Sequence, residues 1–302
     1  MCGIAGLHLR DESLRPDLGS LLQSMLCQAA ARGTDAAGVG IYGDEALTPA
    51  GRSTVCVVDS PLPPEQAAAL LDAVLPAGPG GPVQACAAGQ TTVFTAPAAA
   101  EVLEAAVRSA LPGAVLTSRG NSLAVMKGTG HPDALADAFR LSTATGYQGV
   151  AHTRMATESA VTSTGSHPYS VGPDQCMVHN GSFANHATIR RELVAEGVEF
   201  DSENDTEVGA RFVARQLAQG ADVEKALRLL CERFDGFYTL LVATENSFAV
   251  VRDAIACKPA VVAETDRWVA VASEYRYLTG LPGVESARIF EPEPEVVYAW
   301  ER

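Results

Sequence analysis

The sequence predicts an α+β protein in which two layers of β-strands lie between outer layers of helices. Several short segments, among them 237–243 and 247–252, are apolar at successive positions, which is expected of strands covered on both faces. Other segments, such as 18–29, carry apolar residues at helical spacing. Helices on the outside and two sheets between them accommodate both patterns. A chain of 302 residues is long enough to bury one large core or two modest ones.

Composition argues against several classes of protein. The net charge of −14 disfavours nucleic-acid binding, because a phosphate backbone is held mainly by Lys and Arg. No apolar run approaches the roughly 18 residues of a membrane span, and no signal peptide is recognisable. The 7 cysteines include no Cys-x-x-Cys pair, and Cys176 with His179 has no second pair to complete a zinc site. We expect a reduced, cytoplasmic protein with no metal or cofactor on this chain.

The first 42 residues are expected to form a strand, a helix and a second strand. Residues 2–9 are predicted to form a short buried strand, and the helical spacing over 18–29 follows it. The segment 32–38 reads Arg-Gly-Thr-Asp-Ala-Ala-Gly and precedes the apolar strand 39–42. Its glycines permit close backbone approach, which a plain turn and a substrate pocket both use.

Between about residues 43 and 118 the composition changes to Ala, Gly and Pro, and we interpret this region as a small αβ insertion. Two amphipathic helices, 64–75 and 98–111, are expected to alternate with strands at 55–58 and 91–95. The reactive side chains here are isolated cysteines, so we expect the insertion to carry little chemistry.

Polar residues are concentrated after residue 149. The segment 149–154 is apolar and ends in His-Thr-Arg, and 176–181 repeats this design and ends in His-Asn-Gly. For each segment alone, termination of a strand is the simpler explanation. Together they predict a site at a sheet edge where both strands end. Between them lies the polar loop 162–169, in which His167 is restricted by the following proline.

The acidic cluster 201–207 precedes a predicted helix at 208–217. Carboxylates near a helix N-terminus suit the helix dipole, so capping explains the cluster as a group and does not single out Asp205. The remaining chain alternates between the two patterns. We expect helices at 132–141, 185–196 and 222–234 and strands at 121–127, 237–243, 247–252, 260–263 and 268–272.

Cys2 is a candidate nucleophile once the initiator Met is removed, and the small Gly3 does not hinder that removal. An N-terminal cysteine carries a thiol and an α-amine whose pKa of about 7.7 to 8.0 leaves part of it neutral near pH 7. One residue then supplies both nucleophile and base. Position alone favours the simpler alternative, a small apolar residue that starts the first strand.

Six short motifs favour Cys2 as a nucleophile over Cys2 as a simple apolar residue. Together they resemble the motifs of the class II glutamine amidotransferases, which are N-terminal-nucleophile hydrolases. Each motif alone is weak, but all occur in the family's order and span nearly the whole chain apart from the insertion. The motifs are Met-Cys-Gly-Ile-Ala-Gly at 1–6, Arg-Gly-Thr-Asp at 32–35, His-Thr-Arg-Met-Ala-Thr at 152–157, His-Pro-Tyr at 167–169, His-Asn-Gly at 179–181 and Asn-Asp-Thr-Glu at 204–207.

The resemblance implies a single domain over residues 1–302 with a four-layer αββα sandwich, and it assigns a role to each matching residue. Glutamine would be the substrate, hydrolysed through a γ-glutamyl thioester. A guanidinium suits a carboxylate, and a carboxylate suits an ammonium, so the pair assigned to the α-groups makes chemical sense. The implied roles are Cys2 as nucleophile with its own amine as base, the Asn180 side chain and Gly181 amide as oxyanion hole, Arg154 for the α-carboxylate, Asp205 for the α-ammonium, and Thr157 and His167 in the surrounding pocket.

The chain departs from the family pattern in ways that bear on function. Met155 stands where the family has Trp, and Glu158-Ser159 stands where it has His-Gly, so binding or coupling at the glutamine site is expected to differ. Family enzymes fused to a synthase carry a second domain that consumes the ammonia. The resemblance here implies a stand-alone amidotransferase subunit of a glutamate-synthase-like or N-methylglutamate-synthase-like hetero-oligomer, with flavin and iron–sulfur clusters only on the partner chains.

Two alternatives remain open at the level of sequence. One is a non-catalytic regulatory or scaffolding subunit that retains the fold, which the departures at Met155 and Glu158 favour. The other is an N-terminal-nucleophile hydrolase for a different amide. The pairing of Arg154 with Asp205 for the two α-groups of an amino acid argues against the second.

Overall fold

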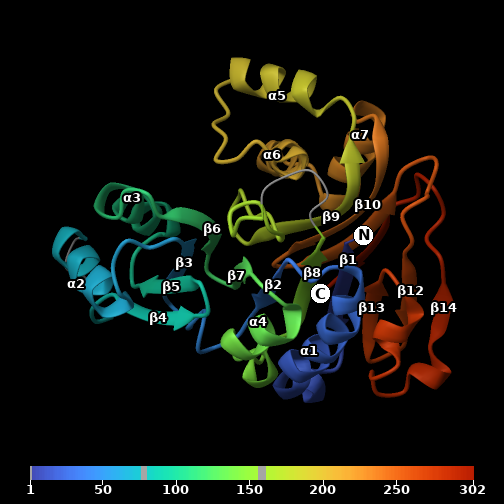
Figure 1. Cartoon of the computed structure of the whole chain (residues 1–302), viewed down its shortest axis with the longest axis horizontal. Coiled ribbons are helices and arrows are strands. Elements are labelled where there is room, and N and C mark those ends of the chain that lie inside the picture. The colour runs from blue at the N-terminus through green and yellow to red at the C-terminus, as the bar shows by residue number, and fades with distance from the viewer. Residues whose placement is uncertain (1, 76–79, 156–160) are drawn as a thin grey trace.

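The structure is a computed structural model that describes residues 2–75, 80–155 and 161–302. A layer of helices, two β-sheets and a second layer of helices are stacked in that order, and a third, smaller sheet lies beside them (Figure 1). The α+β class and the αββα sandwich expected from the sequence are confirmed.

The larger sheet consists of seven antiparallel strands in the order β14-β12-β13-β1-β8-β2-β7. Its strand β1, which follows Cys2 directly, is paired on both sides, with β13 and with β8. The Ile4 amide also donates to Ser273 Oγ at 2.9 Å. The seven strands are β1 (Gly3–Leu9), β2 (Ala36–Tyr42), β7 (Leu123–Thr129), β8 (Gln148–Arg154), β12 (Val261–Glu264), β13 (Trp268–Ala272) and β14 (Arg288–Phe290).

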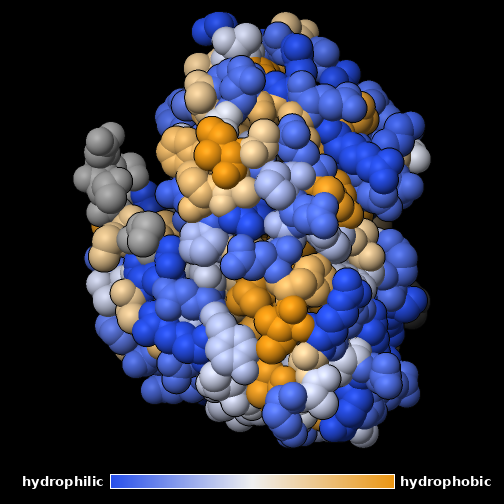
Figure 2. All heavy atoms as spheres, turned by 90° about the vertical axis from the view of Figure 1, so that its right-hand side faces the viewer, coloured by the Kyte–Doolittle hydropathy of each residue, from blue (hydrophilic) through white to orange (hydrophobic). Residues whose placement is uncertain are grey.

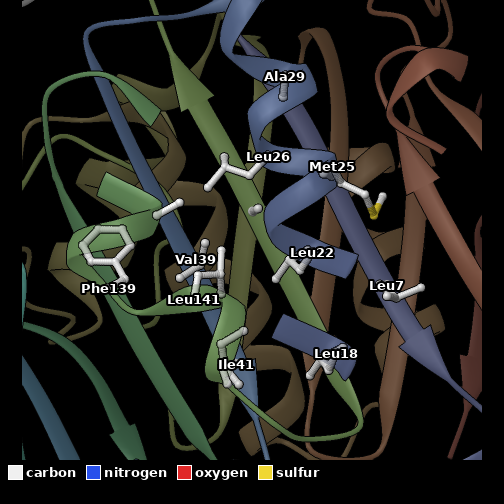
Figure 3. Close-up of a cluster of buried hydrophobic side chains, with 14 of the residues drawn as sticks. Leu7, Leu18, Leu22, Met25, Leu26, Ala29, Val39, Ile41, Phe139 and Leu141 are labelled. Carbon is white, nitrogen blue, oxygen red and sulfur yellow. The ribbon is translucent and has the colours of Figure 1, made fainter. Parts of the chain in front are cut away.

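Helix α1 (Leu18–Ala29) covers the outer face of this sheet and confirms the helix expected there. Its buried residues recur every three or four positions, which places them on one side of the helix. Figure 3 shows them directed onto side chains of β1 and β2. Burying each leucine contributes about 1.5 to 3 kcal/mol. The shorter α4 (Pro132–Ala138) packs beside α1.

The second sheet has four strands in the order β15-β11-β10-β9, so that β9 lies at its edge. Val178, Leu241 and Val250 face the first sheet in a shared core, and helices cover the other face. The elements of these two layers are β9 (Gln175–Phe183), β10 (Gly236–Thr244), β11 (Ser247–Arg252), β15 (Tyr298–Glu301), α5 (His186–Ala195), α6 (Asp205–Ala218) and α7 (Val223–Arg233).

The region expected to be an insertion contains a third sheet of order β4-β5-β3-β6, with two helices packed on it. The Asp174 carboxylate joins this sheet to the start of β9, because it accepts from the backbone amides of Asn121 and Ser122 in the turn after β6 and of Leu123 at the start of β7. The elements are β3 (Ser53–Val58), β4 (Gln84–Ala88), β5 (Thr91–Ala96), β6 (Val115–Gly120), α2 (Pro64–Val74) and α3 (Ala100–Ala110).

Four strands were not expected from the sequence: β4, β6, β14 and β15. The first, β4, is an Ala-rich edge strand that is mostly exposed, and β14 and β15 are edge strands of three and four residues. Short edge strands lack the continuous apolar pattern that reveals a buried strand, because one side of them faces solvent.

The side of the molecule near β12 and β14 is largely hydrophilic, with a patch of hydrophobic residues in its lower half and a further group in its upper half (Figure 2). Within the described ranges, none of the helices combines the length and apolar character needed to cross a membrane.

Candidate functional site

Cys2 lies directly before β1 and is half-buried. Two side chains donate to its backbone carbonyl oxygen: Asn180 Nδ2 at 3.0 Å and Arg32 Nε at 2.9 Å. The Arg32 guanidinium also forms an ion pair with Glu274, at 2.9 Å. The next residue, Gly3, donates its amide to Thr153 Oγ1 at 3.2 Å. Cys2 is therefore held at a fixed position at the end of the central strand.

The two strands with polar residues belong to different sheets, which corrects the expectation of one shared sheet edge. Strand β8 lies between β1 and β2 inside the larger sheet, whereas β9 is the edge of the smaller one. The two meet across the sandwich, where His152 Nε2 donates to the His179 carbonyl at 3.2 Å. The site is thus built between two stacked sheets.

Asn180 and Gly181 also lie inside β9, since the strand continues to Phe183. In register, they face Thr239 and Tyr238 of β10. Gly181 has φ +145°, and a Cβ at this position would collide with the Phe237 carbonyl oxygen. Only glycine lets the two backbones approach this closely.

Arg154 is the last residue of β8 and is 7% exposed. Two glycines leave space around it: a Cβ on Gly33 would collide with the Arg154 backbone, and a Cβ on Gly165 would lie 2.9 Å from its Nη1. The Gly33 of the Arg-Gly-Thr-Asp motif is therefore required by close backbone approach. Thr157, expected in the glutamine pocket, lies outside the described residues.

Asp205 is the first residue of α6, and its side chain makes a different contact from those of the capping groups around it. The N-cap is Asn204, whose Oδ1 accepts from the Thr206 amide at 2.9 Å. The Glu207 carboxylate accepts from the Asp201 and Ser202 amides. Asp205 instead turns back to β9, where its Oδ2 accepts from the Phe183 amide at 2.9 Å. This contact ties the start of α6 to the strand that carries Asn180.

His167 lies in a buried cluster with two histidines that sequence reasoning treated only as parts of motifs. Its ring lies 4.0 Å from that of His152, and its Nε2 is 2.9 Å from Thr206 Oγ1. The Nδ1 of His179 lies 2.8 Å from the same hydroxyl. Burial lowers the pKa of all three histidines, to about 3 for His152, so they are neutral at pH 7.

These contacts bring most of the predicted site residues into one continuous network. Strand β9 and Thr206 link five of them: Cys2, Asn180, Gly181, Asp205 and His167. Arg154 is the last residue of β8, which pairs with β1. Sequence reasoning missed Arg32, His152, His179 and Thr206 as site residues, although each stands inside one of the six motifs. Their position in those motifs was the one available signal.

A cleft of about 900 Å³ lies elsewhere, at the start of β9 and the turn between β10 and β11. Gln175 lines it, and the five residues from there to Asn180 span about 17 Å of strand. None of the predicted site residues lines this cleft. In the part of the chain that the structure describes, no group of three or more His, Cys, Asp or Glu is arranged to hold a metal ion.

Comparison with known proteins finds similarity to glutamine amidotransferases. The model of the glutamine amidotransferase domain family matches residues 152–280. The chain is 46% identical to the glutamine amidotransferase-like protein GlxB of Rhizobium meliloti, over all of this chain and 98% of that protein. It is 29% identical to a putative glutamine amidotransferase of Methanothermobacter thermautotrophicus, over 91% of this chain and 92% of that protein.

A solved structure resembles the overall fold. It is the glutamine phosphoribosylpyrophosphate amidotransferase from B. subtilis, with a TM-score of 0.59 and 16% sequence identity. The match covers 99% of this chain, and the chain spans about half of that protein, 49% of its length.

Proposed function

Because the chain belongs to the class II glutamine amidotransferases, we propose that it hydrolyses glutamine to glutamate and ammonia, with Cys2 as nucleophile, and passes the ammonia to a separate synthase chain. One observation carries the catalytic part of this proposal. The side-chain amide of Asn180 lies 3.0 Å from the carbonyl oxygen of Cys2, which brings an amide donor next to the residue that would attack.

The first half of the reaction forms a thioester. The Cys2 amine, free after removal of Met1, accepts the thiol proton, and the thiolate attacks the side-chain carbonyl carbon of glutamine. Negative charge develops on the carbonyl oxygen. Asn180 Nδ2 carries two hydrogens, so it can donate one to Cys2 and the other to this oxygen, beside the Gly181 amide. The carbon–nitrogen bond then breaks, the Cys2 ammonium returns its proton to the leaving nitrogen, and ammonia departs.

The second half releases glutamate. The Cys2 amine takes a proton from water, the hydroxide attacks the thioester carbon, and the sulfur leaves as the thiol once it is reprotonated. The same oxyanion donors serve both halves, because the charge develops on the same oxygen each time. Two fixed donors of this kind lower the barrier by several kcal/mol in other acyl-transfer enzymes.

Substrate recognition uses the two α-groups of glutamine. Arg154, buried at the end of β8, binds the α-carboxylate, and Asp205, held against β9, binds the α-ammonium. His167 and Thr157 complete the pocket. A buried guanidinium and a carboxylate that are both fixed by the protein suit a small zwitterion better than an uncharged amide.

The acceptor of the ammonia is proposed by family analogy. In the solved amidotransferase the matching fold makes up about half of a longer chain. We assign the acceptor step to glutamate-synthase-like partner chains that bring their own flavin and iron–sulfur clusters. All seven cysteines of this chain carry free thiols, as a cytoplasmic protein would keep them.

A non-catalytic regulatory or scaffolding subunit with the same fold is the second candidate. It is favoured by Met155, which is 42% exposed directly after Arg154, where the family has Trp. An exposed thioether cannot enclose a bound ligand as an indole does.

The test is hydrolysis of glutamine by the protein alone and together with the chains that co-purify with it. Cys2→Ala should abolish glutamate release and leave the thermal unfolding temperature unchanged, whereas Cys257→Ala, at an exposed cysteine, should retain full activity. Mass spectrometry after treatment with a glutamine-like diazoketone should place the label on Cys2 and show loss of Met1. Activity near wild type in Cys2→Ala would refute the mechanism. Wild-type protein that neither hydrolyses glutamine nor takes the label would favour the non-catalytic subunit.

A further inference from the structure

Thr206 lies where the segments that carry the proposed glutamine-binding groups meet. Its Oγ1 is 2.9 Å from His167 Nε2, 2.8 Å from His179 Nδ1 and 3.5 Å from Asp205 Oδ1. The residue is 1% exposed, so solvent does not compete for these contacts. One hydroxyl therefore joins the loop before β9, strand β9 itself and the start of α6.

The number of hydrogens restricts how these contacts are arranged. A hydroxyl has one hydrogen and two lone pairs, and each neutral imidazole has one N–H. Burial lowers the pKa of His167 and of His179, so both rings are neutral at pH 7. If Thr206 donated its hydrogen to one ring, the hydrogen of that ring would have to sit on the opposite nitrogen.

Those opposite nitrogens are poor places for a hydrogen. His167 Nδ1 and His179 Nε2 are both buried and have no hydrogen-bond partner among the described residues. A buried N–H without an acceptor costs about 1 to 3 kcal/mol, and a bare nitrogen lone pair is tolerated better. The favoured arrangement places both ring hydrogens on Thr206 Oγ1, one on each lone pair. The hydroxyl hydrogen is then left for Asp205.

We propose that Thr206 is a positioning residue that orients the Asp205 carboxylate toward the α-ammonium of glutamine, an inference that rests on the proposed function. Asp205 Oδ2 is already fixed by the Phe183 amide at 2.9 Å, and the Thr206 hydroxyl fixes Oδ1. The two histidines set the direction of the hydroxyl by occupying both of its lone pairs. The carboxylate is thus held at both oxygens before substrate arrives.

The first test measures where the hydrogens are and does not require activity. In ¹⁵N NMR spectra of the wild-type protein, His167 should be protonated on Nε2 and His179 on Nδ1. His179→Gln and His167→Gln variants assign the two signals. If either ring carries its hydrogen on the other nitrogen, Thr206 must donate to that ring, and the proposal is overturned.

The second test separates orientation of Asp205 from general support of the fold. Thr206→Val keeps the shape and removes the hydroxyl, whereas Thr206→Ser keeps the hydroxyl. The wild type should prefer glutamine over 4-carbamoylbutanoate, which is glutamine without its α-amine. In Thr206→Val the KM for glutamine should rise about tenfold with little change in kcat, and the preference should shrink by the same factor. Thr206→Ser should restore both.

The outcomes distinguish this inference from the proposed function. An unchanged preference in Thr206→Val, or an equal rise in KM for both substrates, would show a merely structural role and overturn the inference. A wild type that hydrolyses neither substrate would overturn the proposed function, and the NMR result would still decide the direction of the Thr206 hydroxyl. Thermal unfolding of each variant shows whether it is folded, and if Thr206→Val is not, the NMR result on the wild type decides alone.

Discussion

The side-chain amide of Asn180 donates to the backbone carbonyl of Cys2 at 3.0 Å, although the two residues lie 178 positions apart in the chain. This contact joins the residue before the central strand of one sheet to the edge strand of the other. It fixes the separation between the proposed nucleophile and the proposed oxyanion donor, and it can be tested from both sides.

Replacing Asn180 should impair chemistry more than binding. Asn180→Ala removes a donor to the developing oxyanion, so kcat for glutamine hydrolysis should fall about 10² to 10³-fold with little change in KM. Asn185→Ala is the matched control, because Asn185 Nδ2 also donates to a backbone carbonyl, that of Arg233, away from the site. Steady-state kinetics of both variants would contradict the oxyanion role if Asn180→Ala kept its kcat.

Arg32 should support the position of Cys2. Arg32→Leu removes the second donor to the Cys2 carbonyl and leaves Glu274 without this ion pair. A hydrogen bond from a charged donor is worth about 1.5 to 3 kcal/mol, so the rate at which a diazoketone labels Cys2 should fall about 10- to 100-fold. Arg10→Leu is the control: Arg10 likewise bonds a backbone carbonyl and a glutamate, at an exposed position. Equal labelling rates in both variants would rule out this role for Arg32.

Two glycines with similar backbone conformation should respond differently to alanine. Gly181 has φ +145° and no space for a Cβ, whereas Gly130 has φ +128° and no atom within 4 Å of a Cβ. Gly130→Ala should lower the free energy of unfolding by about 1 kcal/mol through backbone strain alone. Gly181→Ala must in addition displace the backbone of β10, so we expect a much larger loss or failure to fold. Urea denaturation compares the two, and equal losses would mean that β9 and β10 separate easily.

The buried histidines should make the fold sensitive to acid. Burial holds the pKa of His152 at about 3 and that of His179 well below its usual value, whereas an unfolded histidine titrates near 6.5. Below about pH 6.5 the unfolded chain therefore binds protons that the folded chain does not, and stability falls as the pH drops toward the folded pKa. Over this range, each such histidine lowers the free energy of unfolding by about 1.4 kcal/mol for each unit by which the pH falls. Above about pH 6.5 it has no such effect.

Denaturant titrations between about pH 5 and 7.5 measure this slope. His152→Gln keeps a donor for the His179 carbonyl but cannot titrate. The slope of its stability against pH should therefore be smaller than that of the wild type by the equivalent of one proton. His131→Gln, at an exposed histidine, should keep the wild-type slope. If all three proteins shared one slope, His152 would not be a source of the acid sensitivity.

Much of the fold could be predicted from the sequence because its central strands and helices are buried in regular patterns. The helix at 18–29 and the strand at 247–252 were predicted close to their observed bounds for this reason. The edge strands β14 and β15 were missed, since they are short and partly exposed. Their pairing partners β12 and β11 decide that they form strands, and the local sequence does not.

The sequence indicated which residues come together near Cys2, but not how they are arranged. Motif order indicated Cys2, Arg154 and Asn180, yet a pattern along the chain does not show that β8 and β9 belong to different sheets. Likewise, the acidic cluster at 201–207 gave no means to tell the cap Asn204 from Asp205, because both residue types suit a helix N-terminus. The difference appears only once β9 presents the Phe183 amide to Asp205.

The positions of the pairing partners of β1 in the chain decide when this strand can pair during synthesis. Its neighbours β8 and β13 lie roughly 140 and 260 residues later in the chain, so β1 has no partner until β8 has been made, and its second partner comes only with β13. At about 5 to 20 residues per second, the synthesis of those roughly 140 residues takes about 7 to 28 seconds. The proposed mechanism needs Met1 to be removed, and that removal can therefore take place before the sheet closes around Cys2.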